Sequence, residues 1–160
     1  MSKTTWTIDP VHTQVGFSVK HMMFTKVHGE FTELSGAIEV DPDKPGEASV
    51  EVQIDAASID TGVEDRDEHL RSSDFLDVEN HPTITFESRR IEGEPSEPGD
   101  AFKVVGDLTI RGTTEEVVLD ARYEGRGEDP WGGTRAGFSA EVTIDRRDFG
   151  LTWNQALETG

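Results

Sequence analysis

The sequence predicts an all-β protein, an antiparallel barrel or sandwich of long strands with one short helix. Apolar and polar residues alternate with a period of two over about seven segments, which is typical of strands with one wet face. Short turns rich in Gly, Pro and Asp separate most of these segments. Only 33% of the residues are hydrophobic, which suits a thin-walled β structure better than a helical globule.

The opening stretch favours the barrel over the sandwich. Alternate residues from Val15 to Met23 form one face of a strand, and the apolar positions stay odd from Val27 to Phe31. From Leu34 to Val40 they become even, and a slip of one residue turns every side chain to the opposite face. We therefore expect a bulge or sharp bend near Gly29–Gly36, as a sheet that rolls up requires.

The remaining strands follow in order along the chain. After a turn cluster at 41–47, alternation predicts strands over 48–55, 83–90, 102–110, 117–123 and 136–144. A turn is expected at Arg111-Gly112-Thr113, and polar loops at 93–100 and 125–133. Between 72 and 82 the chain is irregular, with Phe75, Leu76 and Val78 turned inward.

One helix is expected, from Val63 to Ser72. Its first turn is acidic and Arg71 lies near its end, which complements the helix dipole, and Leu70 is the residue expected to point inward.

The charge balance disfavours two classes of partner. The chain has 33 acidic and 15 basic side chains, a formal net charge of -18. Such a field repels nucleic acid and anionic membrane surfaces. High solubility and adaptation to a salty cytoplasm both explain the acidity. An acidic patch for a cationic partner explains it less well, because the acids are spread along the chain.

The composition also excludes or disfavours several kinds of site and segment. The chain has no cysteine, so disulfides, thiol catalysis and cysteine-ligated zinc are excluded. No apolar stretch resembles a signal peptide or a membrane span. We therefore expect a single domain over residues 1–160 in the cytoplasm, without stable membrane insertion.

If the sheet closes, one face of each strand lines its interior. A barrel of about eight strands is either filled by side chains or holds one slender ligand. Recurring small residues on the inward face and an adaptable Met22-Met23-Phe24 gate are compatible with a ligand. The expected interior residues are Val15, Phe17, Val19, Leu34, Ile38, Val50, Val52, Ile84, Phe86, Leu108, Ile110, Val117, Leu119, Phe138, Ala140 and Val142.

No catalytic or metal site is predicted. The five histidines show no H-E-x-x-H or other short metal spacing, and no G-x-S-x-G is present. The Asp65-Asp67-Glu68 cluster lacks the spacing and central glycine of an EF-hand, and a solvated helix face explains it better.

Five segments resemble a known family. They are W-T-I-D-P-V-H-T-Q-V-G-F-S-V-K-H (6–21), F-T-K-V-H-G-E-F (24–31), H-L-R-S-S-D-F-L-D-V-E-N-H-P-T-I-T-F (69–86), L-T-I-R-G-T-T (108–114) and D-R-R-D-F-G-L-T-W-N (145–154). In this order they resemble the YceI-like family of lipocalin-like, polyisoprenoid-binding proteins. The resemblance implies an extended antiparallel barrel around an apolar tunnel for a long isoprenoid, such as a polyprenyl phosphate or a quinone tail. Members are often dimeric, some are periplasmic, and no enzymatic activity is established for the family as a whole.

Carried over residue by residue, the resemblance implies both tunnel and headgroup positions. No cofactor is expected other than a bound isoprenoid lipid. Candidates for contact with a phosphate or quinone oxygen are His12, Lys20, His21 and Arg71. The implied tunnel or tunnel-mouth residues are Phe17, Val19, Met23, Phe24, Phe31, Leu70, Phe75, Leu76, Phe86, Phe138, Phe149, Leu151 and Trp153.

The chain departs from the family pattern at its end. In the family the W-N-x-x-L-E-T-G segment leads into a glycine turn and a closing strand, whereas this sequence stops at Gly160. We therefore expect either a truncated barrel or an open seam, and an open seam favours a homodimer.

Three functions follow as hypotheses. The first is a non-catalytic isoprenoid carrier, the second a histidine-based hydrolase or metal-assisted enzyme, and the third a stress-related acidic interaction module. The second requires two or more of His12, His21, His28 and His69 to converge in a cleft.

Overall fold

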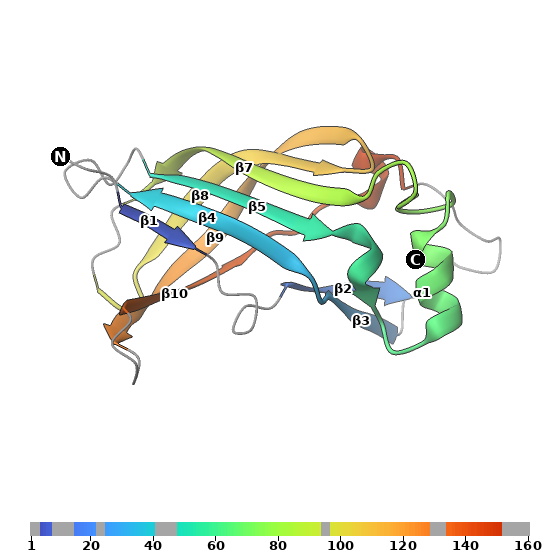
Figure 1. Ribbon diagram of the computed structural model, residues 1–160, viewed down its shortest axis with the longest axis horizontal. Coiled ribbons are helices and arrows are strands. Elements are labelled where there is room, and N and C mark those ends of the chain that lie inside the picture. Colours follow the sequence, from blue (N-terminus) through green and yellow to red (C-terminus); the bar gives the residue numbers. More distant parts are fainter. Residues whose placement is uncertain are drawn as a thin grey trace.

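The computed structural model describes residues 4–7, 15–21, 25–40, 48–93, 97–128 and 134–151. Most of them lie in one antiparallel sheet of seven strands, which curls into a half-barrel (Figure 1). Its strand order is β1 (Thr4–Thr7), β4 (Leu34–Val40), β5 (Ser49–Asp55), β7 (Thr83–Glu92), β8 (Ala101–Ile110), β9 (Thr113–Glu128) and β10 (Thr134–Glu141). The predicted all-β, lipocalin-like fold with one short helix is confirmed.

A second sheet of three strands lies at one end of the half-barrel (Figure 1). It consists of β2 (Val15–His21), β3 (Thr25–Phe31) and the short β6 (Ile59–Asp60). The bend predicted near Gly29–Gly36 is where the chain passes from this sheet into the large one. The Thr32 N–H donates to the Ser58 carbonyl at 3.2 Å, and the Asp55 N–H donates to the Glu33 carbonyl at 3.0 Å. The shift in alternation therefore marks two strands in different sheets.

The predicted helix is confirmed as α1 (Glu64–Arg71). Glu64, Asp65 and Asp67 lie in its first turn, and Leu70 packs against buried core residues as expected. Asp67 is buried and accepts hydrogen bonds from the backbone N–H and the hydroxyl of Thr61. These bonds attach the helix to the end of β6.

The turn predicted at Arg111-Gly112-Thr113 joins β8 and β9, but it consists of Arg111 and Gly112 alone because Thr113 already begins β9. Arg111 and Gly112 have φ values of 52° and 73°, the left-handed conformations that a tight turn between twisted strands needs. The loop predicted from Gly125 is wrong over its first residues, because β9 continues to Glu128 and pairs with β10. Gly125, with φ 115°, lies beside the register shift between Gly137 and Phe138 in this pairing. The conformational freedom of glycine lets the strand continue past this irregularity.

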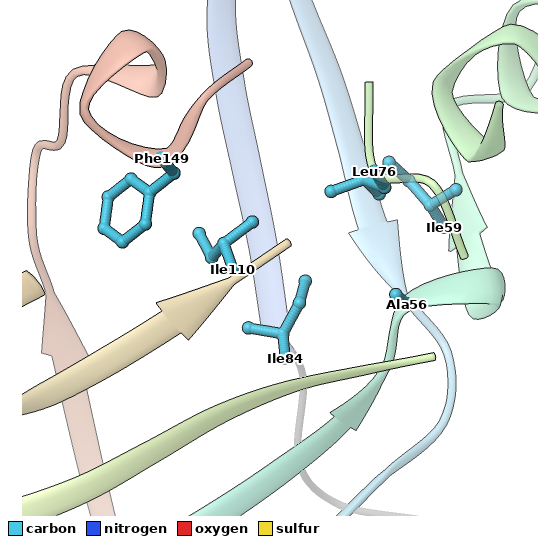
Figure 2. Close-up of a cluster of buried hydrophobic side chains, with 6 residues drawn as sticks. All are labelled: Ala56, Ile59, Leu76, Ile84, Ile110 and Phe149. Atoms are coloured by element: carbon cyan, nitrogen blue, oxygen red, sulfur yellow. The ribbon is translucent and has the colours of Figure 1, made fainter. Parts of the chain in front are cut away.

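The described buried residues form two clusters. The first, which we call the packed end, joins side chains from the sheet, from the segment after α1 and from the 3₁₀ helix at Arg146–Phe149, as Figure 2 shows. Its members are Ala56, Ile59, Leu76, Ile84, Ile110 and Phe149. The second, which we call the apolar wall, is formed by Phe86, Val104 and Ala121 with Val52, Ile91, Phe102, Leu108, Val117 and Leu119 packed against them. Leu108 contacts both clusters.

The sheet does not close within the described part of the chain, where β1 and β10 are its edges. Phe138 and Ala140 are opposite Tyr123 and Ala121 on the predicted inner face, but the burial expected for them and for Val142 is wrong, because all three side chains are exposed. An edge strand has a neighbour on one side only, so side chains on β10 and just beyond it are covered less than those on β8. None of the described helices is long and apolar enough to cross a bilayer.

Candidate apolar ligand site

The inner face of the large sheet presents apolar side chains in register. Val52 is opposite Phe86, which is opposite Leu108. Towards the β9–β10 hairpin, Val104 is opposite Leu119, and Phe102 is opposite Ala121. Alternation places these residues on one face because successive side chains of a strand point to opposite sides. The result is a continuous apolar surface that crosses four strands.

Three aromatic side chains lie at the β9–β10 end of this surface. The rings of Phe102 and Phe138 are 6.1 Å apart and nearly perpendicular, and those of Tyr123 and Phe138 are 5.4 Å apart. We call these three residues the aromatic mouth. Phe138 is 47% exposed even though it contacts both other rings. The apolar wall therefore ends in an aromatic group that water reaches.

The packed end is closed by side chains and hydrogen bonds. Phe149 is 1% exposed. From the β8–β9 turn, the guanidinium of Arg111 donates to the Gly150 carbonyl at 3.1 Å and to the Ser73 carbonyl at 2.8 Å. This side chain ties the turn to the segments that carry Phe149 and Leu76. The apolar interior is thus solid at this end.

Charged pairs lie on the outer face of the same strands. Arg89 bridges Asp107 at 3.0 Å and Glu116 at 3.4 Å, and Lys103 approaches Asp120 at 3.4 Å. Hydrogen bonding to Asp107 raises the pKa of Arg89 further above its usual value. The two faces therefore differ in kind, with ion pairs outside and hydrocarbon inside.

Comparison with known proteins identifies the family. The sequence matches the family model of the YceI-like domain over residues 6–160. The chain belongs to the YceI-like family. A UPF0312 protein of Azotobacter vinelandii is 41% identical over 140 residues, which are 88% of this chain and 71% of that protein. A second, from Pectobacterium atrosepticum, is 40% identical over 141 residues, with the same two coverages.

Solved structures share the YceI-like fold. BcnA of Burkholderia cenocepacia superposes with a TM-score of 0.78 at 26% identity, covering 92% of this chain and 86% of that one. The YceI protein of Campylobacter jejuni gives 0.70 at 35% identity, with coverages of 91% and 83%. A polyisoprenoid-binding domain from Saccharophagus degradans gives 0.62 at 14% identity, with coverages of 87% and 76%, a likeness of fold alone.

The structure separates the tunnel residues that the YceI-like resemblance implied. Phe86 belongs to the apolar wall and Phe138 to the aromatic mouth. Phe75 lies beside His69, with ring centroids 5.1 Å apart, and the Arg146 guanidinium is 5.8 Å from its centroid. Six others lie in or against the packed end: Phe17, Phe31, Leu70, Leu76, Phe149 and Leu151.

Several predicted residues fall outside the described part of the chain. Met23, Phe24, Trp153 and the headgroup candidate His12 lie outside the described residues. So do the side chains of Val19, Lys20 and His21, whose backbone belongs to β2. Their roles stay predictions.

The fourth headgroup candidate, Arg71, has hydrogen bonds within the fold. Its Nε donates to the Ala57 carbonyl at 2.9 Å and its Nη2 to the Ile59 carbonyl at 3.1 Å. Two of its donor groups are therefore already used in holding the end of α1 against the 3₁₀ helix at Ala56–Ser58 and the start of β6.

Five residues of the apolar wall and the aromatic mouth were not among the interior or tunnel residues predicted from the sequence: Ile91, Phe102, Val104, Ala121 and Tyr123. Phe102, Val104 and Tyr123 were on the inner face by alternation, but only the register shows that Phe102 and Tyr123 meet Phe138. The signal that could have found them is the long β8–β9 hairpin, in which Phe102 is opposite Ala121 and Tyr123 is two residues beyond it.

The histidines do not gather in the part of the chain that the structure describes. His69 bonds Asp74 through Nε2 at 2.9 Å, His28 is exposed on β3, and the His81 ring lies against Gly112. Among the described residues, no three His, Asp or Glu side chains are grouped as a metal site would require. The metal-assisted hypothesis finds no support there.

An open groove of about 740 Å³ lies over β8, β9 and β10, away from the packed end. Its lining is rich in charged side chains of the outer face, including Lys103, Asp120 and Glu141. Phe102 and Ala121 of the apolar wall also line it, so the groove reaches the mouth end of the wall, but Val104 and Phe86 are not among its lining residues.

Proposed function

We propose that this protein binds a long isoprenoid chain against the apolar wall and carries it without chemical change. Membership of the YceI-like family supports a binding role. The fold is shared with a domain described as polyisoprenoid-binding. A polyprenyl phosphate and a quinone tail are the two ligands that we propose for comparison.

The observation that supports the proposal is the continuous apolar surface on the inner face of the large sheet. Phe86, Val104 and Ala121 are buried in the wall. All wall residues are apolar, and the surface that they form ends at the exposed ring of Phe138. A hydrocarbon gains about 0.8 kcal/mol for each CH₂ group that it transfers from water to such a surface. A long tail can therefore bind tightly without a specific polar contact.

The experiment that tests the proposal is recovery of the natural ligand. We expect organic extraction of protein purified from its own host to release a prenyl lipid that mass spectrometry identifies. The control is protein carrying Val104→Asp, which puts a carboxylate in the middle of the wall and should come out without the lipid. Failure to recover or load any prenyl lipid, from the host or from detergent-dispersed polyprenols, would remove the proposal.

The remaining expectations about assembly and location stay predictions. A homodimer would be detected by light scattering of the purified protein. The cytoplasmic location would be detected by fractionation of the host.

A further inference from the structure

The ring of Phe86 lies against the neighbouring strand because residue 106 is glycine. A Cβ atom at Gly106 would lie 2.6 Å from Cζ and 2.9 Å from Cε1 of Phe86, and 2.5 Å from the Glu87 carbonyl oxygen. Carbon atoms in contact normally stay about 3.5–4.0 Å apart. Any side chain at this position would therefore have to lift the ring or displace β7.

Phe86 also stands at the boundary between the two apolar regions. Ile84, two residues earlier on the same face, belongs to the packed end, whereas Phe86 belongs to the apolar wall. Leu108, directly opposite Phe86, contacts both clusters. Gly106 lies on the side of Leu108 that faces the aromatic mouth, so the ring leans away from the packed end and over the start of the wall.

We propose that Phe86, whose ring fits against Gly106, is the stop that limits how far an apolar chain can enter from the aromatic mouth. This inference rests on the proposed function and adds a specificity to it. From Phe102 to Gly106, where the Phe86 ring lies, β8 extends over about 13 Å. A tail that follows this strand meets the Phe86 ring, and behind the ring the interior is filled by Ile84, Ile110 and Phe149. The pair therefore fixes a maximum length for the bound part of the tail.

A second pair of the same kind provides a matched control. The ring of Phe17 lies on Gly29, its partner across β2 and β3, and a Cβ at Gly29 would contact Cζ of Phe17 and lie 2.9 Å from Cγ2 of Thr61. This pair packs against the packed end. Removing its ring should weaken the fold without changing the length of tail that is bound.

The test uses the full chain and a graded series of all-trans prenols as the probe. Affinity for each prenol is measured by the change in intrinsic tryptophan fluorescence, for the unchanged protein and for Phe86→Leu, Phe86→Ala and Phe17→Leu. For the unchanged protein we expect affinity to rise with tail length and then level off. Both Phe86 variants should move this limit to a longer prenol, and the first prenol beyond the original limit should bind at least about tenfold more tightly.

The outcomes separate this inference from the function on which it rests. If no form of the protein binds any prenol, the proposed function is wrong, and so is the proposed role of Phe86 as a stop. If prenols bind but the limit is the same in both Phe86 variants, only the stop is wrong. The same conclusion holds if Phe17→Leu moves the limit as far as Phe86→Leu. Circular dichroism checks that each variant is folded, and Phe86→Leu serves as the milder change if Phe86→Ala is not.

Discussion

Strand β8 reaches both ends of the half-barrel, with Ile110 at the packed end and Phe102 at the aromatic mouth, and the two ends differ in what covers them. At the packed end Phe149 is 1% exposed, whereas at the aromatic mouth Phe138 is 47% exposed. The packed end receives Ile59, Leu76 and Phe149 from segments outside the large sheet, and these side chains fill the space above it. All residues of the apolar wall come from the large sheet itself.

This difference separates stability from binding. A sheet surface covered by inserted side chains is a core. Its apolar contacts form when the protein folds, so they contribute to the free energy of unfolding and not to ligand affinity. Phe86, Val104 and Ala121 in the wall are as buried as the packed end, so the surface that keeps transfer free energy available for a ligand is the mouth, where Phe138 is exposed. We therefore expect substitutions at the packed end to act on the free energy of unfolding, and those at the mouth to act on affinity.

The largest effect is expected for Phe149→Ala. Because the ring is almost fully buried, its loss should lower the free energy of unfolding by about 3–5 kcal/mol. Urea denaturation followed by circular dichroism measures this change. A loss below about 1 kcal/mol would mean that the packed end is not the core that the structure shows.

Removal of the Asp67 carboxylate should have the next largest effect. Asp67→Ala leaves the Thr61 N–H and hydroxyl without their acceptor and should cost about 1–3 kcal/mol. Asp67→Asn keeps one acceptor oxygen and should cost less. Hydrogen exchange should show faster opening of α1 in the alanine variant, and equal losses in the two variants would contradict an acceptor role.

Phe138→Ala, the same chemical change at the mouth, should have a small effect on stability. The exposed ring has less contact to lose, so we expect less than about 1 kcal/mol in the same urea experiment. Affinity for prenols should fall, because the ring borders the wall at the end where the tail enters. If the variant is as destabilised as Phe149→Ala, the contrast between the two ends is wrong.

The smallest effect concerns the surface cap of the 3₁₀ helix that carries Phe149. Asp145 accepts hydrogen bonds from the side chain of Arg147 at 3.0 and 2.9 Å and from its backbone N–H at 3.0 Å. The side-chain bond, and then the backbone bond, hold the pKa of Asp145 below its ordinary value.

The sign of this contribution follows from the lowered pKa. A carboxylate with a lowered folded pKa stabilises the fold above its unfolded pKa and loses this contribution as the pH falls through the folded value. NMR titration should give Asp145 a midpoint below that of an ordinary aspartate. Arg147→Gln should raise the midpoint, and an unchanged midpoint would show that the guanidinium has no influence.

The strand pattern and the helix could be predicted because each depends on local sequence. Alternation assigned Ile84 and Phe86 to the inner face, and the acidic first turn with Arg71 near the end located α1. The one-residue shift in alternation around Gly29–Gly36 revealed a change of direction. It could not reveal a change of sheet, because that depends on the partners that β3 and β4 find elsewhere in the chain.

The site was harder to predict for a physical reason. Alternation says which face a side chain occupies, but not what lies above that face. Phe149 and Phe138 were both assigned to the tunnel, and only the inserted segments at one end and the sheet edge at the other made their exposures differ.

The sequence by itself determined the all-β class, the faces of the strands, the position of the helix and the family resemblance. Tertiary structure alone decided where the apolar interior becomes solid and where the ring of Phe86 comes to rest on Gly106. Side chains that are distant in sequence compete for the same space only after the sheet has curled, so their packing is not encoded in any local pattern.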